Sequence, residues 1–547
     1  MSVAKRAHVY PQVTLAAAEL VDTAVVTAPA GITAADGWRL ARKREAGVVA
    51  CGEGSYALRE DLARAVALGL GDVPARSLTR PLPVVARHAP ELDVRRRLAE
   101  GAIAVVVTDG RTVAGAVARA PRPRTVSLGP HLVRTLEPAG RELLTTAGRL
   151  AEAVVARAFV AGGIVRDAWR AHAVAAHDLD VVVEGDGLAV ARALASELGG
   201  GLVEHERFLT ASVTTRADVR IDVVTARSER YESPGALPRV MPATIEQDLR
   251  RRDFAVNAMA AALGGEWPLL DPLGGIPDLS RRRLRVLHPL SFVEDPTRMM
   301  RAARYAARLE FTLDAWTVRC QALAVELAPY PALSGQRLAA ELERLVADAR
   351  PAVALTRVGR AGVFRIIEPR YRFTSRTAHA VAAFEETLGW TAVHGLAVPP
   401  LHLALAALLT GQPRTVAGAF LEHLALRGEP LARLLHALDE KRGRPSGGRT
   451  TADAHITPLA LATHYLTGDA GVRARLTGVV AATRAAKGEL RGDELIELGV
   501  PRGPAVGTVL DGIRGRRRRG EIADRAAEID YVRSWVSERN RDDEREG

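Results

Sequence analysis

The feature that most narrowly limits the fold is a Gly-Gly turn between two apolar runs, the second of which carries paired aspartates. The first run ends at Gly162-Gly163, Ile164–Trp169 has a helical pattern, and Asp178 and Asp180 lie in the second run. Glycines at such a turn let backbone N–H groups approach a phosphate, and the helix N-terminus adds partial positive charge. Aspartates at i and i+2 of a strand share one face of a sheet, where a bound Mg²⁺ offsets their repulsion. The segment therefore predicts a strand–turn–helix–strand unit with a pocket for a triphosphate and a divalent metal.

A third acid extends this site. Arg220–Val224 alternates like a half-buried strand and carries Asp222, and in a compact sheet it would lie beside the strand of Asp180. Three carboxylates on adjacent strands can hold two Mg²⁺ ions, one activating an attacking hydroxyl and the other supporting the triphosphate and its leaving group. The alternative is that Asp222 only pairs with a neighbouring arginine.

Three more motifs follow in order. They are Arg251-Arg-Asp-Phe-Ala-Val-Asn257, Asp271-Pro-Leu-Gly-Gly275 and Glu294-Asp-Pro-Thr-Arg298. Together with the Gly-Gly and aspartate motif they resemble the class II nucleotidyltransferases of the polymerase β superfamily. That family includes bacterial CCA-adding enzymes, their CC-adding and A-adding relatives, and poly(A) polymerases. The resemblance extends from about Leu136 to Asn540.

The resemblance implies roles for particular residues. Asp178, Asp180 and Asp222 would be the catalytic, metal-binding carboxylates, with two Mg²⁺ ions, and ATP and CTP would be the substrates. Nucleotide binding would involve Gly162, Gly163, Arg252 and Asn257 at phosphate or sugar, and Asp253 at the 2′-hydroxyl. Arg166 is a further nucleotide-binding candidate, for which pairing with Asp167 is an equally good interpretation.

The motif at 294–298 resembles the family's base-reading motif, and its chemistry can be argued directly. In a helix, Asp295 and Arg298 are three residues apart and project from the same side. The carboxylate would accept from an exocyclic amino group, and the guanidinium would donate to ring nitrogens or a carbonyl. Cytosine and adenine both present an amino group beside an acceptor nitrogen, whereas uracil and guanine leave buried groups unpaired at roughly 1–3 kcal/mol per contact. The alternative is a surface salt bridge.

A basic stripe continues from this motif. Arg298, Arg301, Arg304 and Arg308 recur at helical spacing, and we expect Arg301 and Arg304 to contact nucleotide or primer backbone. The alternative is a solvated helix face. The segment starting at Ser334 carries a capping signal and resembles the family's neck motif, with Arg337 and Glu341 supporting base recognition.

The N-terminal region contains an internal duplication. Residues 25–62 and 77–120 are related at an offset of about 55 residues, each with a strand, an Arg-rich helix and further strands. This resembles a pair of CBS modules, which bind adenine nucleotides in many proteins and would form a homodimer interface here. Of the usual ligand residues only Asp61 is retained as a candidate for ribose. A structural or dimerising module without ligand is as good an interpretation as an adenylate sensor.

The C-terminal region resembles the family's tail. Backbone amides at Gly499–Gly503, beside a helix expected to start near Pro504, would clasp an RNA phosphate. Arg516, Arg517 and Arg518 add positive charge, and with Gly499 and Gly503 they are the RNA-binding candidates, for which a solvated charge run is the alternative.

Composition agrees with a multidomain enzyme that has an anionic partner such as RNA. The 547 residues carry a net charge of +11, and the apolar fraction of 48% is ample for cores. Aromatic residues make up only 4%, so the cores must be packed from Ala, Val and Leu. Two cysteines exclude a disulfide framework. We expect no membrane association and a cytoplasmic location, because neither a signal-type core nor a transmembrane span is evident.

The expected fold class is multidomain α/β plus all-α. The expected parts are an N-terminal segment (1–24), a CBS domain pair (25–120), a linker (121–139), a polymerase β-type nucleotidyltransferase head (140–280), a helical neck with the base-recognition motif (281–345), a helical body (346–445) and a helical RNA-binding tail (446–547).

The expected function is template-independent addition of CCA to tRNA 3′ ends. A-adding or CC-adding partial activity and poly(A) synthesis remain alternatives, and a loop near Glu204–Thr214 is the candidate for switching from C to A addition. An adenylate-sensing RNA-binding regulator is the alternative from another class. The enzyme hypothesis requires that Asp178→Ala abolish transfer and leave tRNA binding intact.

Overall fold

The computed structural model describes residues 15–118, 126–173, 179–216, 218–439, 457–485 and 488–546. The chain forms two compact units, one comprising residues 1–372 and 422–425, the other residues 373–421 and 426–547. Asp178 and the expected boundaries at 120–121 and 445–446 lie outside the described residues. Within the described ranges, no helix combines the length and apolar character needed to cross a membrane.

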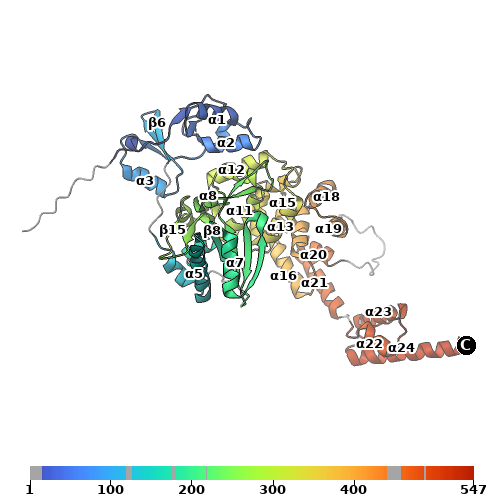
Figure 1. Ribbon diagram of the computed structural model, residues 1–547. Coiled ribbons are helices and arrows are strands. Elements are labelled where there is room, and N and C mark those ends of the chain that lie inside the picture. Colours follow the sequence, from blue (N-terminus) through green and yellow to red (C-terminus); the bar gives the residue numbers. More distant parts are fainter. Residues whose placement is uncertain are drawn as a thin grey trace, which may run out of the picture. The chain divides into compact units, whose positions relative to one another are not determined.

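A seven-stranded mixed sheet forms the centre of the first unit (green in Figure 1). Its order is β15 (Leu269–Leu270), β14 (Ala260–Ala262), β7 (Arg157–Ala161), β8 (Leu179–Glu184), β11 (Arg220–Thr225), β10 (Thr210–Thr214) and β9 (Gly201–His205). Strand β11 pairs in parallel with β8, with Asp222 opposite Asp180. The expectation that the two acidic strands are neighbours is therefore confirmed.

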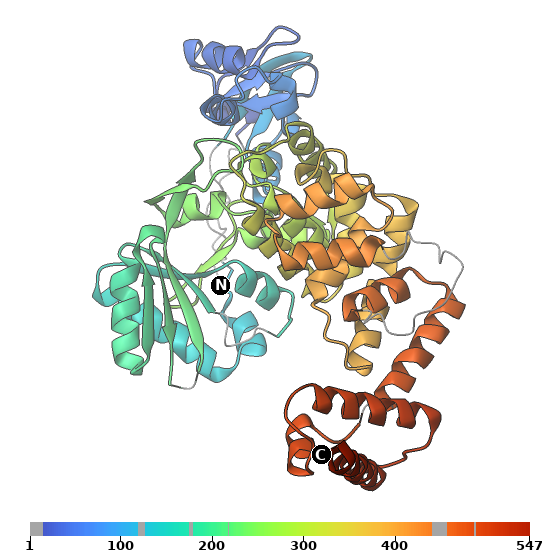
Figure 2. The same cartoon turned by 90° about the vertical axis from the view of Figure 1, so that its right-hand side faces the viewer.

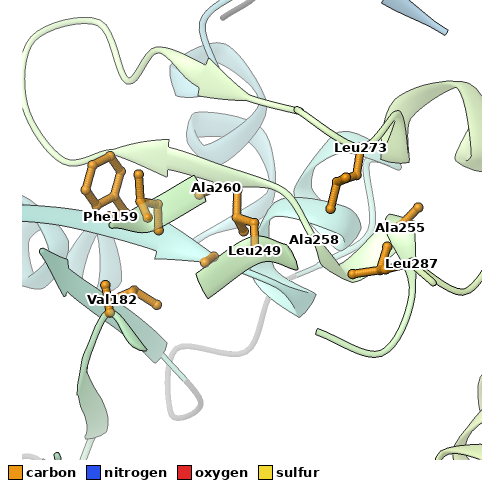
Figure 3. Packing of buried hydrophobic residues seen from close by; sticks show 11 residues of the cluster. Phe159, Val182, Leu249, Ala255, Ala258, Ala260, Leu273 and Leu287 are labelled. Carbon is orange, nitrogen blue, oxygen red and sulfur yellow. The ribbon is translucent and has the colours of Figure 1, made fainter. Parts of the chain in front are cut away.

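Two helices pack on this sheet, α5 (Pro138–Ala153) against β7 and α7 (Gly187–Leu198) against β10 and β11. The turn after β7 leads into α6 (Gly163–Trp169), as the glycine pattern predicts. The core between sheet and neighbouring segments is built largely from small residues, including Ala255, Ala258 and Ala260 (Figure 3). Apart from Phe159 and Ile245 its members are Ala, Val and Leu, so the prediction of Ala-, Val- and Leu-based packing is confirmed for this core.

Segments around the sheet complete the head. They are α4 (Gly129–Thr135), β12 (Arg227–Arg230), β13 (Arg239–Pro242), α8 (Ile245–Arg250), the 3₁₀ turn Ala255–Asn257, α9 (Gly275–Ser280) and β16 (Arg283–Leu284). Helix α4 lies inside the range expected as a linker.

The N-terminal region contains two similar three-stranded sheets. One comprises β1 (Val25–Thr27), β2 (Val48–Ala50) and β3 (Tyr56–Leu58), with α1 (Ala34–Lys43) between the first two strands. The other comprises β4 (Val84–Ala86), β5 (Val105–Asp109) and β6 (Thr112–Val117), with α3 (Glu91–Ala99). In both, the first two strands are parallel and the third is antiparallel. The expected duplication is thus present, with α2 (Arg59–Ala67) following the last strand of the first copy.

Helices dominate the rest of the first unit, as the sequence pattern predicts. They are α10 (Ser291–Glu294), α11 (Thr297–Arg308), α12 (Ala315–Glu326), α13 (Gly335–Val346) and α14 (Pro351–Arg360), with a short strand β17 (Thr312–Leu313). The side chain of Ser334 caps α13 by accepting from the amide of Arg337, as the capping signal indicates.

The second unit is helical throughout its described residues (orange to red in Figure 2). Its helices are α15 (Ser375–Ala382), α16 (Phe384–Val393), α17 (Pro400–Leu409), α18 (Arg414–His423), α19 (Glu429–Asp439), α20 (Pro458–Thr467), α21 (Ala470–Ala485), α22 (Gly492–Glu497), α23 (Pro504–Arg519) and α24 (Arg525–Glu546). The last three pack around a core that contains Leu495, Val509 and Val532.

The segment expected as a loop near Glu204–Thr214 is instead a β-hairpin. Strands β9 and β10 pair antiparallel and are joined by a 3₁₀ turn, Glu206–Phe208. The reason lies in the alternation of the second strand, where Ala211 and Val213 are buried and their neighbours are partly exposed. A period of two of this kind favours a strand over a loop.

Candidate active site

A cavity of about 880 Å³ in the first unit gathers most of the predicted site residues. Predicted residues in its lining are Gly162, Gly163, Arg166, Asp180, Arg252, Asp253, Asn257, Asp295, Arg298, Arg301 and Arg304. They come from the turn after β7 and the helix α6 that follows it, from β8, from the segment after α8, from the connection between α10 and α11, and from α11. Three motifs that are far apart in the sequence therefore meet at one site.

Asp180 and Asp222 form the acidic edge of this site. They are register partners on parallel strands, and parallel neighbours lie about 4.8 Å apart. Asp180 is exposed on β8, and Asp222 is half-buried on β11. Asp222 accepts from the Ser212 hydroxyl at 2.5 Å and from Arg220 Nε at 3.0 Å, so the arginine pairing weighed against metal binding is present.

These two carboxylates are suitable ligands for a hard divalent cation, since oxygen donors from adjacent strands are what Mg²⁺ takes from proteins. Arg220 is 60% exposed, and an ion pair this exposed contributes about 0–1 kcal/mol, so it does not preclude a metal at Asp222. Among the described residues no group of three or more His, Cys, Asp or Glu side chains is placed to hold a metal ion. Asp178, the expected third carboxylate, is outside those residues.

The turn at Gly162 differs in one respect from the expectation. The Gly162 amide, expected to contact phosphate, donates to the Met259 carbonyl at 3.0 Å, because the pairing of β7 with β14 continues past Ala161. Gly162 has φ +80°, and a Cβ there would lie 2.6 Å from Nη1 of Arg252. Glycine is needed here so that the Arg252 guanidinium can approach the turn.

The segment after α8 is held together by charged hydrogen bonds. Asp253 accepts from Arg301 through Nε at 3.0 Å and Nη2 at 2.6 Å, and from Asn257 Nδ2 at 2.9 Å. Burial alone would raise the pKa of Asp253, but the Arg301 guanidinium and the Asn257 hydrogen bond outweigh it and lower the pKa to about 2. Asp253 is therefore a charged acceptor fixed in place.

Arg166 makes the pairing with Asp167 that was weighed against nucleotide binding, and it also contacts Asn257. Its guanidinium pairs with Asp167 through Nε at 2.8 Å and Nη2 at 2.7 Å, and Nη1 donates to Asn257 Oδ1 at 2.6 Å. It thus orients Asn257 at the edge of the cavity.

Asp295 and Arg298 line the same cavity, but they are not on one helix as expected. Asp295 has extended dihedrals between α10 and α11, because a residue that precedes proline, here Pro296, disfavours the α conformation. Its Oδ1 accepts from the Thr297 hydroxyl at 2.7 Å and from Arg337 Nη2 at 3.1 Å. The neck residue Arg337 therefore contacts Asp295 directly, as its proposed supporting role requires.

Arg298 is buried, with only 6% of its surface exposed. Its Nη1 donates to Ser291 Oγ at 2.8 Å and its Nη2 to the Arg251 carbonyl at 2.9 Å. These contacts fix the plane of the guanidinium, which a surface salt bridge would not do.

The arginine stripe of α11 surrounds Tyr305, a residue that the sequence analysis missed. Guanidinium carbons lie 5.5, 5.8, 4.8 and 5.1 Å from the ring centre for Arg166, Arg301, Arg304 and Arg308 respectively. Arg304 is largely buried and pairs with Glu341 at 3.3 Å, whereas Arg308 at the end of the helix is exposed, so the stripe is solvated only in part. The signal for Tyr305 was available, since it lies four residues after Arg301 on the stripe.

Two further cavity residues have no sequence signal that would have identified them. Arg227 and Tyr231 line the cavity from the segment that contains β12. In the part of the chain that the structure describes, Nε of Arg227 and Nε of Arg304 are buried donors without a hydrogen-bond partner. Orphaned cationic donors in a cavity favour an anionic ligand.

The RNA-binding candidates lie in the second unit, the two glycines at the turn before α23 and the arginines in the last turn of that helix. Gly499 and Gly503 have φ of +101° and +112°, and Gly503 immediately precedes the helix, which begins at Pro504 as expected. Arg517 pairs with Glu489 at 2.9 Å and with buried Glu528, so its first task is to hold α23 to its neighbours. Arg516 lies 4.1 Å over the Tyr531 ring, and the side chain of Arg518 is outside the described residues.

A buried histidine next to the base-reading motif gives the first unit a pH-dependent stability. His288 Nε2 lies 3.3 Å from Glu294 Oε2, and burial lowers the His288 pKa from 6.5 to about 4. The unfolded chain then binds more protons between these values, so the free energy of unfolding falls as pH drops from 6.5 toward 4, by up to about 3 kcal/mol. We expect urea unfolding at a series of pH values to show this slope, and His288→Gln to flatten it. An unchanged slope in the variant would contradict the assignment.

The sheet and its cavity define a nucleotidyltransferase head of the poly(A) polymerase kind, and the family of poly A polymerase head domains matches residues 158–285. The CC-adding tRNA nucleotidyltransferase of Deinococcus radiodurans is 34% identical over 416 residues, covering 75% of this chain and 97% of the relative. The chain belongs to the tRNA nucleotidyltransferase family.

In other relatives this chain matches only part of the sequence. The A-adding tRNA nucleotidyltransferase of Geobacter sulfurreducens is 30% identical over 410 residues, covering 71% of this chain but only 46% of the relative. The corresponding shares for the A-adding enzymes of Halalkalibacterium halodurans and Aquifex aeolicus are 47% and 29% of the relative. The chain thus spans about half or less of these relatives.

Solved structures agree with the fold. A CCA-adding enzyme in its apo form II superposes with a TM-score of 0.62 at 27% identity, covering 74% of this chain and 98% of that one. A CCA-adding enzyme in complex with CTP gives 0.61 at 26% identity, covering 75% and 99%. The Thermotoga maritima CCA-adding enzyme complexed with tRNA gives 0.58 at 25% identity, again covering 75% and 99%.

Proposed function

We propose that this protein adds nucleotides to the 3′ end of tRNA without a nucleic-acid template, using CTP and ATP to build the CCA end. The observation that carries the proposal is one cavity lined by Asp180 of the acidic sheet edge, by the fixed carboxylate–amide pair Asp253 and Asn257, and by the carboxylate–guanidinium pair Asp295 and Arg298. Its relatives and structural neighbours, which include enzymes in complex with CTP and with tRNA, support the same conclusion.

The protein groups suit the successive parts of a nucleoside triphosphate. Arg252 and the arginines of α11 supply positive charge for the triphosphate, and the orphaned Nε of Arg304 is a donor for one of its oxygens. Asp253, held ionised by Arg301, is an acceptor for the 2′-hydroxyl of the ribose. Asn257, oriented by Arg166, completes the sugar contacts.

Asp180 and Asp222, with Asp178 as a third carboxylate, are the residues that would hold Mg²⁺. Two bound Mg²⁺ ions would lower the pKa of the RNA 3′-hydroxyl and neutralise the charge on the departing pyrophosphate. The position of the carboxylates determines where the metal ions would bind. Asp180 and Gly163 line the same cavity, so the metal ions would lie next to the end of the cavity that faces the phosphates.

Base selection follows from Asp295 and Arg298. Both are held by protein contacts before any base enters, Asp295 by Arg337 and Arg298 by Ser291. A preorganised acceptor and donor match the amino group and acceptor nitrogen that cytosine and adenine share, and they leave uracil and guanine with unpaired groups. One rigid pair can therefore accept both CTP and ATP.

The C-terminal tail and the N-terminal duplication have proposed roles in the same reaction. We propose that the tail at Gly499 and Gly503 contacts tRNA, that the N-terminal duplication is a CBS pair, and that this pair supports a homodimer. The candidate ribose ligand of that pair, Asp61, is buried and accepts from Arg80 Nε at 2.6 Å and Nη2 at 2.8 Å. An adenine nucleotide at the CBS pair would therefore have to bind without Asp61.

Partial A-adding or CC-adding activity is the nearest alternative, because relatives of both kinds share these motifs. The incorporation of labelled CTP and ATP into tRNA that lacks its CCA end tests the proposal. Incorporation of neither nucleotide would overturn it.

A further inference from the structure

We propose that the N-terminal duplicated module is part of the base-selection apparatus, with Arg64 as a positioning residue that acts through Glu294. This inference rests on the proposed function, because it concerns how the same cavity selects a base. It assigns the module a task other than ligand sensing or dimerisation.

The contact that carries the inference joins residues far apart in the sequence. Nη1 of Arg64, on α2 of the module, donates to Oε1 of Glu294 at 2.7 Å. The side chain of Glu294 is only 5% exposed and that of Arg64 is 36% exposed. Arg64 therefore closes over a buried carboxylate of the motif whose next residue is Asp295.

Glu294 depends on Arg64 for its charge balance. Its second oxygen faces His288, whose pKa is lowered by burial, so the neighbouring imidazole is neutral at pH 7. Arg64 is then the charged group that pairs with Glu294, its Nη1 lying 2.7 Å from Oε1, while the His288 imidazole contacts the other oxygen. Removing one partner of a buried pair leaves an uncompensated charge, which local structure relieves by moving or taking up water.

Movement at Glu294 reaches both base-reading residues through α10. This helix has four residues, Ser291 to Glu294, and each end touches the base-reading pair. At its start Ser291 Oγ accepts from Arg298, and at its end Glu294 precedes Asp295, whose amide donates to the Ser291 carbonyl. A shift of α10 therefore changes the positions of Asp295 and Arg298 together.

The module also holds the segment just before α10. Arg80, paired with buried Asp61, donates through Nη1 to the Leu287 carbonyl at 2.6 Å. The indole Nε1 of Trp316 on α12 donates to the Thr79 carbonyl at 2.9 Å. The module thus holds residue 287 by its backbone and residue 294 by its side chain, so it fixes both sides of α10. This explains why Asp61 is buried in an ion pair.

The test compares nucleotide binding and transfer in full-length Arg64→Ala, Arg64→Lys and Arg59→Ala. Arg59 is exposed on the same helix and serves as the matched control. Isothermal titration with CTP, ATP and UTP measures base preference without turnover, and steady-state transfer to tRNA lacking CCA separates kcat from KM. We expect Arg64→Ala to lower the preference for CTP over UTP about tenfold and to raise KM for CTP and ATP, with KM for tRNA unchanged. Arg64→Lys should restore most of the preference, and Arg59→Ala should match the unsubstituted protein.

Each outcome decides a separate question. An unchanged CTP preference in Arg64→Ala, or an unsubstituted protein that binds CTP and UTP equally, would overturn the role of Arg64. Absence of transfer by the unsubstituted protein would overturn the proposed function, while the binding preferences would still decide the role of Arg64. If Arg64→Ala fails to fold, Glu294→Gln keeps the volume of the side chain, removes its charge and should relax base preference in the same way.

Discussion

Replacement of Asp180 by alanine is expected to lower kcat for nucleotide transfer by about 10³-fold or more, which corresponds to about 4 kcal/mol of transition-state stabilisation. Asp180 faces the cavity from β8 and is the register partner of Asp222, so its loss removes half of the acidic edge that the structure describes. Its side chain is exposed, and the variant should fold. Single-turnover transfer to tRNA lacking CCA measures the effect.

Asp186→Asn is the matched control for this variant. Asp186 is a carboxylate beyond the other end of β8 and outside the cavity lining; it caps α7 by accepting from the Ala189 amide, and asparagine caps a helix equally well. We expect its transfer rate to equal that of the unsubstituted protein. Affinity for tRNA, measured by filter binding, should change by less than about twofold in both variants. The reason is that contacts of basic side chains with the phosphates of the nucleic acid dominate this affinity. Loss of tRNA binding in Asp180→Ala would contradict a purely catalytic role.

The second large effect is expected at Arg298. Arg298→Ala removes the donor of the proposed base-reading pair and leaves Ser291 and the Arg251 carbonyl without this partner, so kcat/KM for CTP and ATP should fall about 10²-fold. Discrimination against UTP should fall about tenfold, because one lost contact corresponds to roughly 1–3 kcal/mol. The measurement is a competition between labelled CTP and UTP at equal concentration.

Two further variants distinguish the role of Arg298 in base discrimination from the effect of its positive charge on triphosphate affinity. Arg298→Lys keeps the positive charge but loses the planar fork, so discrimination should remain low while affinity for triphosphate is retained. Arg319→Ala removes an exposed arginine of α12 outside the cavity lining and should leave both quantities unchanged. Full discrimination in Arg298→Ala would show that the base is read elsewhere.

Local patterns predicted the head well. The apolar run around Asp180 and the alternation around Asp222 predicted two strands, and in the structure these strands pair with the two aspartates opposite each other. The Gly162-Gly163 turn and the start of α23 near Pro504 also followed from short-range chemistry. Such features depend on a few consecutive residues, which a single sequence shows directly.

Two errors came from signals that the sequence did contain. Pro296 disfavours a helix at Asp295, yet one continuous helix was expected there, and the alternation at Ala211 and Val213 indicates a strand where a loop was expected. The pairing of Arg64 with Glu294 and the hydrogen bond of Arg80 to the Leu287 carbonyl could not be predicted in this way. These contacts depend on how the module and head pack, and no local pattern encodes partners that are 230 and 207 residues away.

The most direct test of the central claim offers the purified protein three tRNA transcripts, ending before CCA, after C and after CC. Labelled CTP and ATP are supplied singly and together with Mg²⁺, and the products are sized on a gel. The account predicts that the shortest transcript grows to a full CCA end and then stops. Addition of A only to the CC-ended transcript, or of C only to the shorter ones, would make it a partial enzyme, and long tails would make it a poly(A) polymerase. No incorporation into any transcript would contradict the account.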